Sequence, residues 1–340
     1  MQKGLNSRLT NFIISKLNID KFKYILGDTP LLNIPFKALS QKLIDYQYPA
    51  HLFIETTRAC NLKCIFCPRE LSPLKTGHMD FALFCKIIDE AARFGRRSFC
   101  LHMFGEPFLH PRITEMVGYI KKSNPRHSIL VTTNGYFLDA NKAKKILEDK
   151  LDKITFSIFS LKSDKNKILT NNENINQVIE NIRHLVRLKK KMCGTTKIAI
   201  RFIISDENCD EKRQLRRLAK SLGVTLEVRP AHNYGGSINN SIISRILPRR
   251  RYPCYHPWFS PAVTWDGKVV LCCSDWNYST ALGDLAKETL SSIWQGAKMS
   301  ELRSFHLKGQ FDRIPLCRKC DVWRLYPDIF FAKQKKSAPL

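Results

Sequence analysis

Between residues 50 and 230 the sequence alternates short stretches rich in β-branched and aromatic residues with longer stretches of helical periodicity. This alternation predicts parallel βαβ units. Six strands with five intervening helices suit either an open doubly wound sheet or an incomplete TIM-like barrel. In both folds the active site lies beyond the carboxyl ends of the strands. The expected strands are HLFIETT (51–57), SFCLHMF (98–104), SILVTT (128–133), KITFSIF (153–159), KIAIRFII (197–204) and VTLEVRP (224–230).

Four residues mark where the intervening helices begin or end. Asp80 and Asp139 stand at N-cap positions, where a side-chain oxygen accepts free N–H groups of the first turn. Gly95 and Gly223 fall just past expected helix ends, where a left-handed residue is common. The helices are expected near 80–94, 112–124, 139–150, 173–191 and 210–222.

After residue 230 the pattern changes, which predicts a smaller second unit. The segment SRILPRRRYPCYHP is a basic, proline-punctuated linker, and PAVTWDGKVVLCC predicts a hairpin that turns at Asp266-Gly267. One helix is expected over KETLSSIWQGAKMSELRSFH. We therefore divide the chain into an N-terminal amphipathic extension (1–49), a partial barrel (50–235), a small second domain (236–325) and a basic tail (326–340).

The composition is that of an ordinary globular chain. Its 340 residues are 44% hydrophobic and 25% charged, which suits one large α/β domain with a smaller addition. No apolar run reaches the roughly 18 residues that a membrane-spanning helix needs. The N-terminus MQKGLNSRLTNFIISKLNID lacks the small-residue cleavage site of a secretory signal. We therefore expect a cytoplasmic protein.

A formal net charge of +26 requires an explanation. It favours an anionic partner such as nucleic acid, a phosphorylated or nucleotide-linked substrate, or an anionic membrane surface, although solvated basic faces explain it equally well. No basic run alternates with aromatic residues, so nucleic acid is the least expected partner. The segment LTNFIISKL places Leu9, Ile13 and Leu17 on one helical face, which either packs on the barrel or makes peripheral contact with a membrane.

Twelve cysteines in a cytoplasmic chain are expected to be metal ligands or free thiols, because the cytosol keeps thiols reduced. Seven of them form two groups with ligand-like spacing. The other five are expected to be small buried hydrophobic residues: Cys85, Cys100, Cys193, Cys209 and Cys273.

The first group lies in RACNLKCIFCPRE, directly after the first expected strand, and consists of Cys60, Cys64 and Cys67. A structural zinc site is normally closed by four ligands. Three thiolates around a [4Fe-4S] cluster instead leave one iron without a protein ligand, and that iron can bind a substrate or cofactor. The absence of a fourth nearby ligand therefore favours a reactive iron–sulfur cluster.

The C-x3-C-x2-C spacing, with Phe66 directly before Cys67, resembles the radical S-adenosylmethionine (radical SAM) superfamily. The resemblance covers roughly residues 50–325. It implies a partial (β/α)6 TIM-like barrel and a [4Fe-4S] cluster whose open iron binds SAM. It also implies cleavage of SAM to a 5′-deoxyadenosyl radical that abstracts hydrogen from substrate, and an electron donor such as flavodoxin or ferredoxin.

The same resemblance implies contacts to SAM from loops after later strands. Gly105-Glu106-Pro107 resembles the family's glycine-rich turn, with Phe104 in place of its first glycine, and Glu106 is expected to contact the amino group of SAM. Tight turns and barrel packing are the plain alternatives for these residues. Further expected contacts are Phe66 in the cysteine loop, Thr133 and Asn134 on the same rim, Ser157 at the ribose and Arg201 at the carboxylate.

The second group, Cys254, Cys272, Cys317 and Cys320, resembles the SPASM extension of radical SAM enzymes in its shorter twitch form. No cysteine follows Cys320, so the resemblance implies one auxiliary [4Fe-4S] cluster with four protein ligands. A zinc knuckle is the alternative use of the same thiols. Cys272 is preferred over Cys273 because it has the family's spacing from Gly267 and because neighbouring strand residues point to opposite faces.

These features together predict a radical SAM oxidoreductase that acts on a small carbohydrate-like or anionic metabolite, with the auxiliary cluster as electron acceptor. A radical SAM peptide-maturation enzyme is the alternative, and a zinc-bound nucleic-acid-binding protein is a distant third. His232, Asn233 and Tyr234, after the last expected strand, are candidates to line the substrate pocket, and His232 is the candidate proton acceptor.

Overall fold

A computed structural model describes residues 41, 44–239, 241–243, 251–326 and 328. This part of the chain is built around one nine-stranded sheet in the order β6-β5-β4-β3-β2-β1-β7-β8-β9. Strands β1 to β6 pair in parallel, which confirms the predicted βαβ organisation. All six expected strands are present: β1 His51–Ile54, β2 Ser98–Cys100, β3 Ser128–Thr133, β4 Lys153–Ile158, β5 Lys197–Ile204 and β6 Thr225–Pro230.

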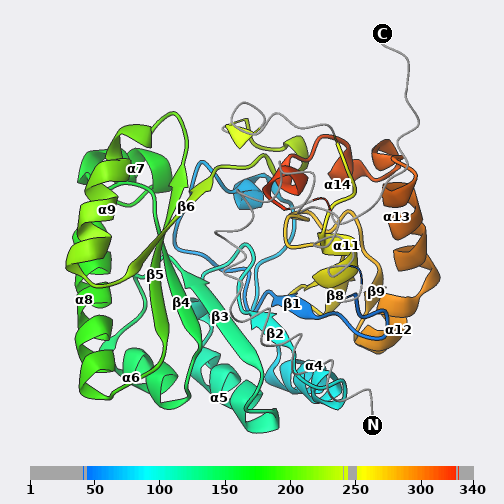
Figure 1. Cartoon of the computed structure of the whole chain (residues 1–340), viewed down its shortest axis with the longest axis horizontal. Helices are drawn as coiled ribbons and strands as arrows, with labels where there is room; N and C mark the ends of the chain where they lie inside the picture. Colours follow the sequence, from blue (N-terminus) through cyan, green and yellow to red (C-terminus); the bar gives the residue numbers. More distant parts are fainter. Residues whose placement is uncertain (1–40, 42–43, 240, 244–250, 327, 329–340) are drawn as a thin grey trace, which may run out of the picture.

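Helices cover the outer side of these strands (Figure 1). The five expected helices are confirmed with small shifts at their ends. An additional helix, α7 Ser163–Thr170, was not predicted, because its N-cap Lys162 makes no side-chain capping bond and so gives no start signal. The expected helices are α4 Phe81–Arg93, α5 Ile113–Ser123, α6 Ala140–Glu148, α8 Ile175–Lys191 and α9 Lys212–Ser221.

The predicted helix boundaries have the expected physical basis. Asp80 Oδ1 accepts hydrogen bonds from the backbone N–H groups of Ala82 at 2.8 Å and Leu83 at 3.0 Å. Asp139 Oδ1 likewise accepts from the N–H of Lys142 at 2.8 Å. Each carboxylate satisfies donors that the first turn leaves free.

The sheet has two different faces. On β3, Ile129 and Val131 are fully buried in the core beneath the helices, and they alternate with the half-buried Leu130 and Thr132 on the inner face. Because the sheet ends at β6 and β9 within the described residues, the barrel does not close. Side chains on its inner face therefore keep part of their surface accessible, which is where a ligand can be held.

The second unit extends the same sheet. Its strands are β7 Ala262–Val263, β8 Lys268–Val270 and β9 Gly283–Asp284, and β7 pairs in parallel with β1 through Phe53 and Ala262. The predicted hairpin is confirmed, with Gly267 at a φ of 87° in its turn. The α-helices that the structure describes in this unit are α11 His256–Phe259, α12 Leu290–Gln295, α13 Ala297–Leu307 and α14 Pro315–Arg318.

Two expectations about this chain are wrong in detail. The helix expected over KETLSSIWQGAKMSELRSFH is two helices, α12 and α13, because Gly296 has an extended ψ of 165° between them. The five cysteines outside the two groups are not fully buried: Cys193 is exposed in the turn after helix α8, Cys209 is exposed at the start of a 3-10 helix after strand β5, and the other three, Cys85, Cys100 and Cys273, are half-buried.

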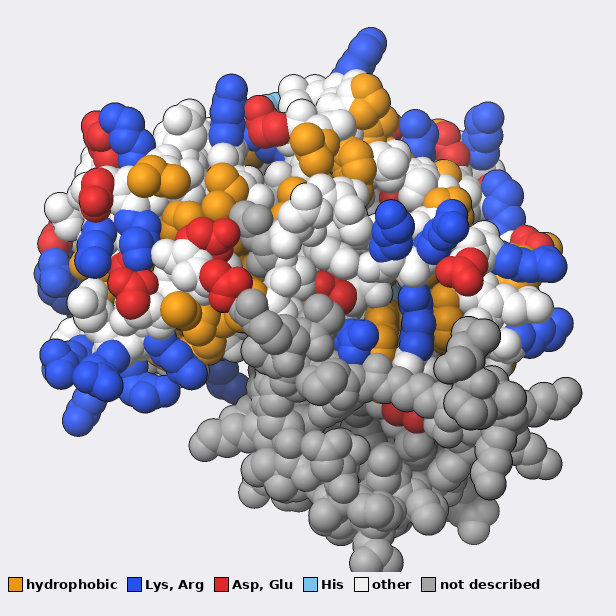
Figure 2. All heavy atoms as spheres, turned by 90° about the horizontal axis from the view of Figure 1, so that it is seen from above, with side chains coloured by type: hydrophobic (Ala, Val, Ile, Leu, Met, Phe, Trp, Pro, Cys, Tyr) orange, Lys and Arg blue, Asp and Glu red, His pale blue; other side chains and the backbone are white. Residues whose placement is uncertain are grey.

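Much of the basic surface lies on helices. Figure 2 shows Lys and Arg side chains gathered at the end of the molecule where Figure 1 places α8 and α9. The α9 residues Lys212, Arg213, Arg216, Arg217 and Lys220 are all exposed. Among the described residues no helix is long and apolar enough to span a bilayer. The amphipathic segment around Leu9, Ile13 and Leu17 and most of the basic tail lie outside the described residues.

Candidate functional site

The three-cysteine loop follows β1 and is attached to the unpredicted helix α7. The backbone N–H groups of Lys63 and Ile65 donate to the carbonyls of Thr170 and Leu169, each at 3.0 Å. Phe66, expected to contact the cofactor, is buried and stacks on Phe159 after β4, with ring centroids 5.3 Å apart. The loop is therefore held by two neighbouring segments of the barrel.

The three thiols of this loop lie close enough to influence one another. Burial raises the pKa of Cys64, and the neighbouring Cys67 and Cys60 raise it further. Burial also raises the pKa of Cys60 to about 11, although the backbone N–H of Leu62 hydrogen-bonds its sulfur. A buried thiolate in such a group needs compensation by positive charge, which a metal cluster supplies.

The turn after β2 fits directly against this loop. A Cβ at Gly105 would lie 2.0 Å from the carbonyl oxygen of Thr57, so only glycine allows the backbones to approach. The N–H of Glu106 donates to the carbonyl of Ala59 at 2.8 Å, directly before Cys60. Pro107 begins a short buried 3-10 helix, Pro107–Leu109.

Glu106 is buried and joins two of the predicted site loops. Its Oε1 accepts from Thr133 Oγ1 at 2.7 Å and from the N–H of Phe108 at 3.0 Å. Its Oε2 accepts from the N–H of Asn134 at 2.7 Å. Three donors occupy most of the roughly four acceptor positions of a carboxylate, so a contact to SAM would use the remaining position on Oε2.

Asn134 connects the same rim to the cysteine loop. Its side-chain Nδ2 donates to Oδ1 of Asn61 at 2.8 Å, and Asn61 directly follows Cys60. Sequence reasoning missed Asn61, although it lies within the cysteine motif. The turns after β2 and β3 and the cysteine loop after β1 therefore form one hydrogen-bonded rim, as expected for loops at the carboxyl ends of parallel strands.

Ser157 and Arg201 lie side by side on the inner face of the sheet, and Arg201 is also in register with Glu227 on β6. The guanidinium of Arg201 donates to Glu227 Oε2 at 3.0 and 3.2 Å and to Thr132 Oγ1 at 3.4 Å. Lys153 forms an ion pair with the other oxygen of Glu227. Burial opposes ionisation, yet Arg201 and Lys153 together hold the pKa of Glu227 below its usual range.

The loop after β6 lies between the two cysteine groups. Burial raises the pKa of Tyr234, and the nearby thiols of Cys67, Cys273 and Cys64 raise it further. Tyr234 has a φ of 45°, a left-handed conformation that is uncommon for a bulky residue. Strain of this kind concentrates at functional sites.

His232 and Asn233 have different surroundings. Burial lowers the pKa of His232 to about 4, and its buried Nδ1 has no hydrogen-bond partner within the described residues. Asn233, expected to line the substrate pocket, instead donates through Nδ2 to the carbonyl of Lys319 at 2.7 Å. The backbone N–H of Asn233 also donates to Asp321 Oδ1 at 3.0 Å, so Asn233 fastens this loop to the second cysteine group.

Three interior residues were not predicted as site residues. His102, after β2, is half-buried, and its Nδ1 is buried without a partner in the described part of the chain. Burial lowers the pKa of His102 to about 3, and the nearby Arg201 lowers it further. Burial also raises the pKa of Cys273 to about 12, and the thiol of Cys100 raises it further. No sequence motif marks these residues, because only the register of the folded strands brings them close to one another.

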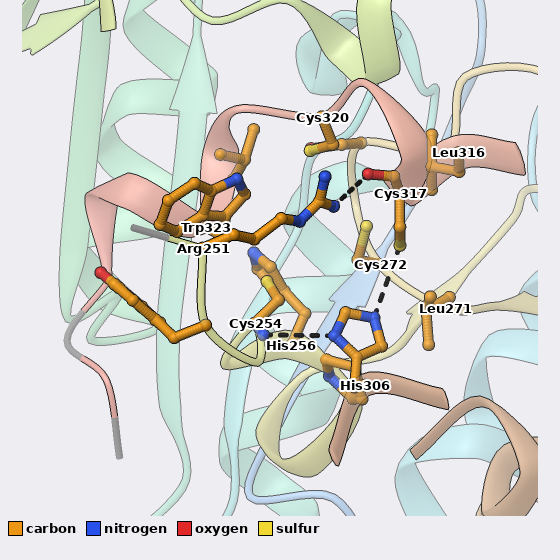
Figure 3. Close-up of a pocket in the computed structure, with 14 residues that line it drawn as sticks. Arg251, Cys254, His256, Leu271, Cys272, His306, Leu316, Cys317, Cys320 and Trp323 are labelled. Carbon is orange, nitrogen blue, oxygen red and sulfur yellow. Dashed lines mark hydrogen bonds between the residues drawn. The ribbon is translucent and has the colours of Figure 1, made fainter. Parts of the chain in front are cut away.

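The second cysteine group lines one pocket with about 410 Å³ of empty space, part of it open to solvent (Figure 3). Cys272 lines this pocket with the other three cysteines, whereas Cys273 is absent from its lining. Burial raises the pKa of Cys317, and Cys320 and Cys254 add to that effect. The four thiols come from the linker before α11, from the end of β8 and from the knuckle around α14.

Two of the four cysteine sulfurs in this pocket accept backbone hydrogen bonds. Backbone N–H groups of His256 and Val322 hydrogen-bond Cys254 and Cys320 and partly offset the effect of burial on the pKa of each thiol. Arg251 Nε is a buried donor without an acceptor among the described residues. An anionic cluster with inorganic sulfides satisfies both kinds of donor.

A zinc ion and a [4Fe-4S] cluster place different demands on the spacing of four thiols. Four thiolates on zinc lie about 3.8 Å apart, from a Zn–S distance of about 2.3 Å and a tetrahedral angle. In the described residues, no three His, Cys, Asp or Glu side chains are grouped as ligands of one metal ion. A [4Fe-4S] cluster spreads its ligands over four irons and therefore fits a wider set of thiols.

A buried ion pair joins the cysteine loop to the second unit, and sequence reasoning missed it. Arg58 Nη1 lies 3.3 Å from Glu55 Oε1 and 3.1 Å from the hydroxyl of Tyr278. Arg58 Nη2 donates to the carbonyl of Trp276 at 2.6 Å and to Ser72 Oγ at 2.9 Å. The charges are fully buried, so this network fixes how the loop meets residues more than 200 positions later.

Two family models match this chain. The radical SAM superfamily model matches residues 54–215, and the SPASM model, an iron–sulfur cluster-binding domain, matches residues 254–321. The chain therefore belongs to the radical SAM superfamily and carries a C-terminal SPASM-type domain. Its cofactors are SAM, a SAM-binding [4Fe-4S] cluster and an auxiliary cluster. The SPASM match also favours an iron–sulfur cluster over zinc at the second cysteine group.

Individual relatives share the overall organisation at low identity. The tungsten-containing aldehyde ferredoxin oxidoreductase cofactor-modifying protein of Pyrococcus furiosus is 26% identical over 80% of this chain and 87% of its own length. The S-adenosyl-L-methionine-dependent 2-deoxy-scyllo-inosamine dehydrogenase of Niallia circulans is 24% identical over 79% of this chain and 91% of its own. The structure of Streptococcus suis SuiB bound to precursor peptide SuiA has a TM-score of 0.64, with 15% identity over 93% of this chain and 83% of that one.

Proposed function

We propose that this chain is an oxidoreductase that removes hydrogen from a small carbohydrate-like or anionic metabolite. When bound, SAM and its cluster supply the hydrogen-abstracting radical, and the auxiliary cluster supplies a one-electron acceptor. We assign the partial barrel to residues 50–235 and the auxiliary-cluster domain to 236–325. The proposed ligands are Cys60, Cys64 and Cys67 for the SAM-binding cluster, and Cys254, Cys272, Cys317 and Cys320 for the auxiliary cluster.

The observation that carries the substrate class is the charge on the inner face of the barrel. Lys153 and Arg201 share the single carboxylate of Glu227, so this group of three carries a net positive charge. Burial strengthens the field of that charge because fewer water molecules screen it. An anionic group of the substrate, or the carboxylate of SAM that Arg201 was expected to face, compensates it.

Two histidines on the same interior are suited to a hydroxylated substrate. The Nδ1 atoms of His102 and His232 are buried without partners among the described residues, so each can bond a substrate hydroxyl or amine. Because burial lowers the pKa of His232 to about 4, this ring is neutral near pH 7 and can accept a proton. We propose His232 as the group that takes the hydroxyl proton when an alcohol carbon is oxidised.

The relatives support two substrate classes. The Niallia circulans relative is named for dehydrogenation of a small aminocyclitol, whereas SuiB binds a precursor peptide and shares the fold. The net positive interior favours a small anionic or polar substrate over a peptide segment. Peptide maturation therefore remains the second candidate function, and the membrane contact proposed for the N-terminus depends on residues outside those described.

The test is substrate-dependent formation of 5′-deoxyadenosine by anaerobically reconstituted protein. Panels of sugar phosphates, nucleotide sugars and aminocyclitols are compared with peptides encoded near the gene. We expect a small metabolite to accelerate the reaction and to yield a product that has lost two hydrogens. Acceleration by a peptide alone would replace this proposal with the second candidate.

A further inference from the structure

His306, on α13, is a buried histidine whose ring contacts two cysteines of the auxiliary-cluster site (Figure 3). The backbone N–H of Cys254 lies 3.3 Å from His306 Nδ1, and His306 Nε2 lies 3.5 Å from the sulfur of Cys317. No motif in the sequence marked this residue. Its position places an imidazole between two proposed ligands of one cluster.

The bond from Cys254 determines which nitrogen of the ring carries the proton. A backbone N–H can only donate, so Nδ1 of His306 must present its lone pair. In a neutral imidazole the proton then lies on Nε2, which faces the sulfur of Cys317. A cluster-bound cysteine is a thiolate and accepts hydrogen bonds. The geometry therefore defines an N–H···S hydrogen bond from His306 to Cys317.

Arg251 adds a fixed positive charge at the same site. Its guanidinium donates to the backbone carbonyls of Cys317 and, at 2.9 Å, of Arg318, which holds it beside the four thiols. Its buried Nε has no acceptor within the described residues and lies in the same pocket lining. Figure 3 shows this side chain between the cysteines of the pocket.

We propose that His306 and Arg251 raise the reduction potential of the auxiliary cluster and so make it an electron acceptor. Reduction adds one negative charge to a cluster that already carries about −2, so donors and cations nearby stabilise the reduced form more than the oxidised form. This inference rests on the proposal that the four cysteines of this pocket hold the auxiliary cluster. It does not depend on the identity of the substrate.

The first cysteine group is built differently. Its sulfurs receive backbone N–H groups, from Leu62 to Cys60 and from Arg69 to Cys67, and none of the described histidines is hydrogen-bonded to these thiols. The side chain of Arg69 forms an ion pair with Glu70 at 2.6 Å, which reduces its effect on the loop. The two clusters are thus expected to differ in potential, with the auxiliary cluster more easily reduced.

The test measures the auxiliary cluster alone by redox titration followed with electron paramagnetic resonance. The full-length chain carries Cys60, Cys64 and Cys67 replaced by Ala, so that only the auxiliary cluster contributes. In this background, His306→Leu removes the donor, and His306→Gln supplies a side-chain amide N–H in its place. Iron content is measured for every variant, and no substrate is present.

His110 provides a matched control. Its Nδ1 also accepts from a backbone N–H, that of Arg112 at 3.0 Å, and its Nε2 lies 3.0 Å from the carbonyl oxygen of Met79. His110 is therefore buried and bonded in the same way, but to a carbonyl and not to a cysteine sulfur. His110→Leu controls for the loss of a buried histidine.

We expect His306→Leu to shift the reduction equilibrium about tenfold toward the oxidised form, which is about 59 mV for one electron. His306→Gln should restore part of the shift, and His110→Leu should leave the potential unchanged. An unchanged potential in His306→Leu with full auxiliary iron would overturn the proposal, as would an equal shift in His110→Leu.

If the His306→Leu variant does not bind iron, the hydrogen bond from His306 is tested in the protein that keeps this histidine. Labelling with ¹⁵N-histidine should give a ¹⁵N coupling in pulsed resonance spectra of the reduced auxiliary cluster. Absence of that coupling would overturn the proposal. Because neither measurement uses substrate, failure of the proposed oxidation reaction would leave this result standing, and the reverse also holds.

Discussion

The buried network of Glu55, Arg58 and Tyr278 should account for several kilocalories of stability. The hydroxyl of Tyr278 donates to Glu55 Oε2 at 2.5 Å and lies 3.1 Å from Arg58 Nη1. Hydrogen bonds to charged groups are each worth about 1.5–3 kcal/mol. Tyr278→Phe removes both and leaves buried charges less well bonded, so we expect the free energy of unfolding to fall by about 3–6 kcal/mol.

Tyr119→Phe is the matched control. The hydroxyl of Tyr119 also bonds a carboxylate, that of Asp89, at 2.8 and 2.9 Å, but this pair lies at the surface. Water replaces the lost bond there, so the expected cost is below about 1 kcal/mol. Both variants lose one phenolic hydroxyl that bonds a carboxylate, so a difference in stability between them measures the effect of burial.

The measurement is anaerobic urea unfolding of the reconstituted protein, followed by far-ultraviolet circular dichroism, with the slope and midpoint compared among the two variants and the parent. Burial raises the pKa of Glu55 although Arg58 and Tyr278 oppose that effect, so loss of the Tyr278 hydroxyl removes one of the groups that compensate the burial of this carboxylate. Equal midpoints for Tyr278→Phe and Tyr119→Phe would refute the reasoning.

Three further predictions follow from the site. With dithionite and SAM the chain should form 5′-deoxyadenosine slowly even without substrate, and Cys64→Ala should abolish this; product from that variant would show that the loop is not the site. Gly105→Ala should prevent stable loading of the first cluster, because its Cβ would lie 2.0 Å from a backbone oxygen. Gly95→Ala is the control: nothing lies near its Cβ but its φ is 83°, so it should lower the free energy of urea unfolding by about 1 kcal/mol. Burial lowers the pKa of His102 to about 3 and of His232 to about 4, so the unfolded chain binds more protons than the folded chain below about pH 6.5. The free energy of unfolding should therefore decrease as the pH is lowered from about 6.5, by at most about 1.4 kcal/mol per pH unit for each ring. His102→Phe should make this decrease less steep.

The strands and most helices could be predicted because their signals are local. Asp80 caps α4 and Gly95 follows it, as the pattern indicated, since capping depends on neighbouring residues only. Helix α7 lacks a side-chain cap and was missed, although the cysteine loop is bonded to its end. The break at Gly296 was also missed, because a glycine within a helical pattern is compatible with a continuous helix.

The cysteine groups could be predicted from spacing, whereas their surroundings could not. Asn61 and Arg58 lie beside the motif, but their partners Asn134 and Tyr278 are brought to them only by the folded chain. His306 is 11 positions from Cys317, and only the packing of α13 beside the knuckle places its ring at the sulfur. Such contacts depend on tertiary structure, for which a single sequence carries no signal.

The most direct test of two separate cluster sites is iron content after anaerobic reconstitution. Two [4Fe-4S] clusters with independent ligands require about eight irons per chain. Replacing Cys60, Cys64 and Cys67 together by Ala should leave about four, with the resonance signal of the auxiliary cluster retained. A chain that takes up stoichiometric zinc and no iron, or a triple variant that still holds about eight irons, would contradict this account.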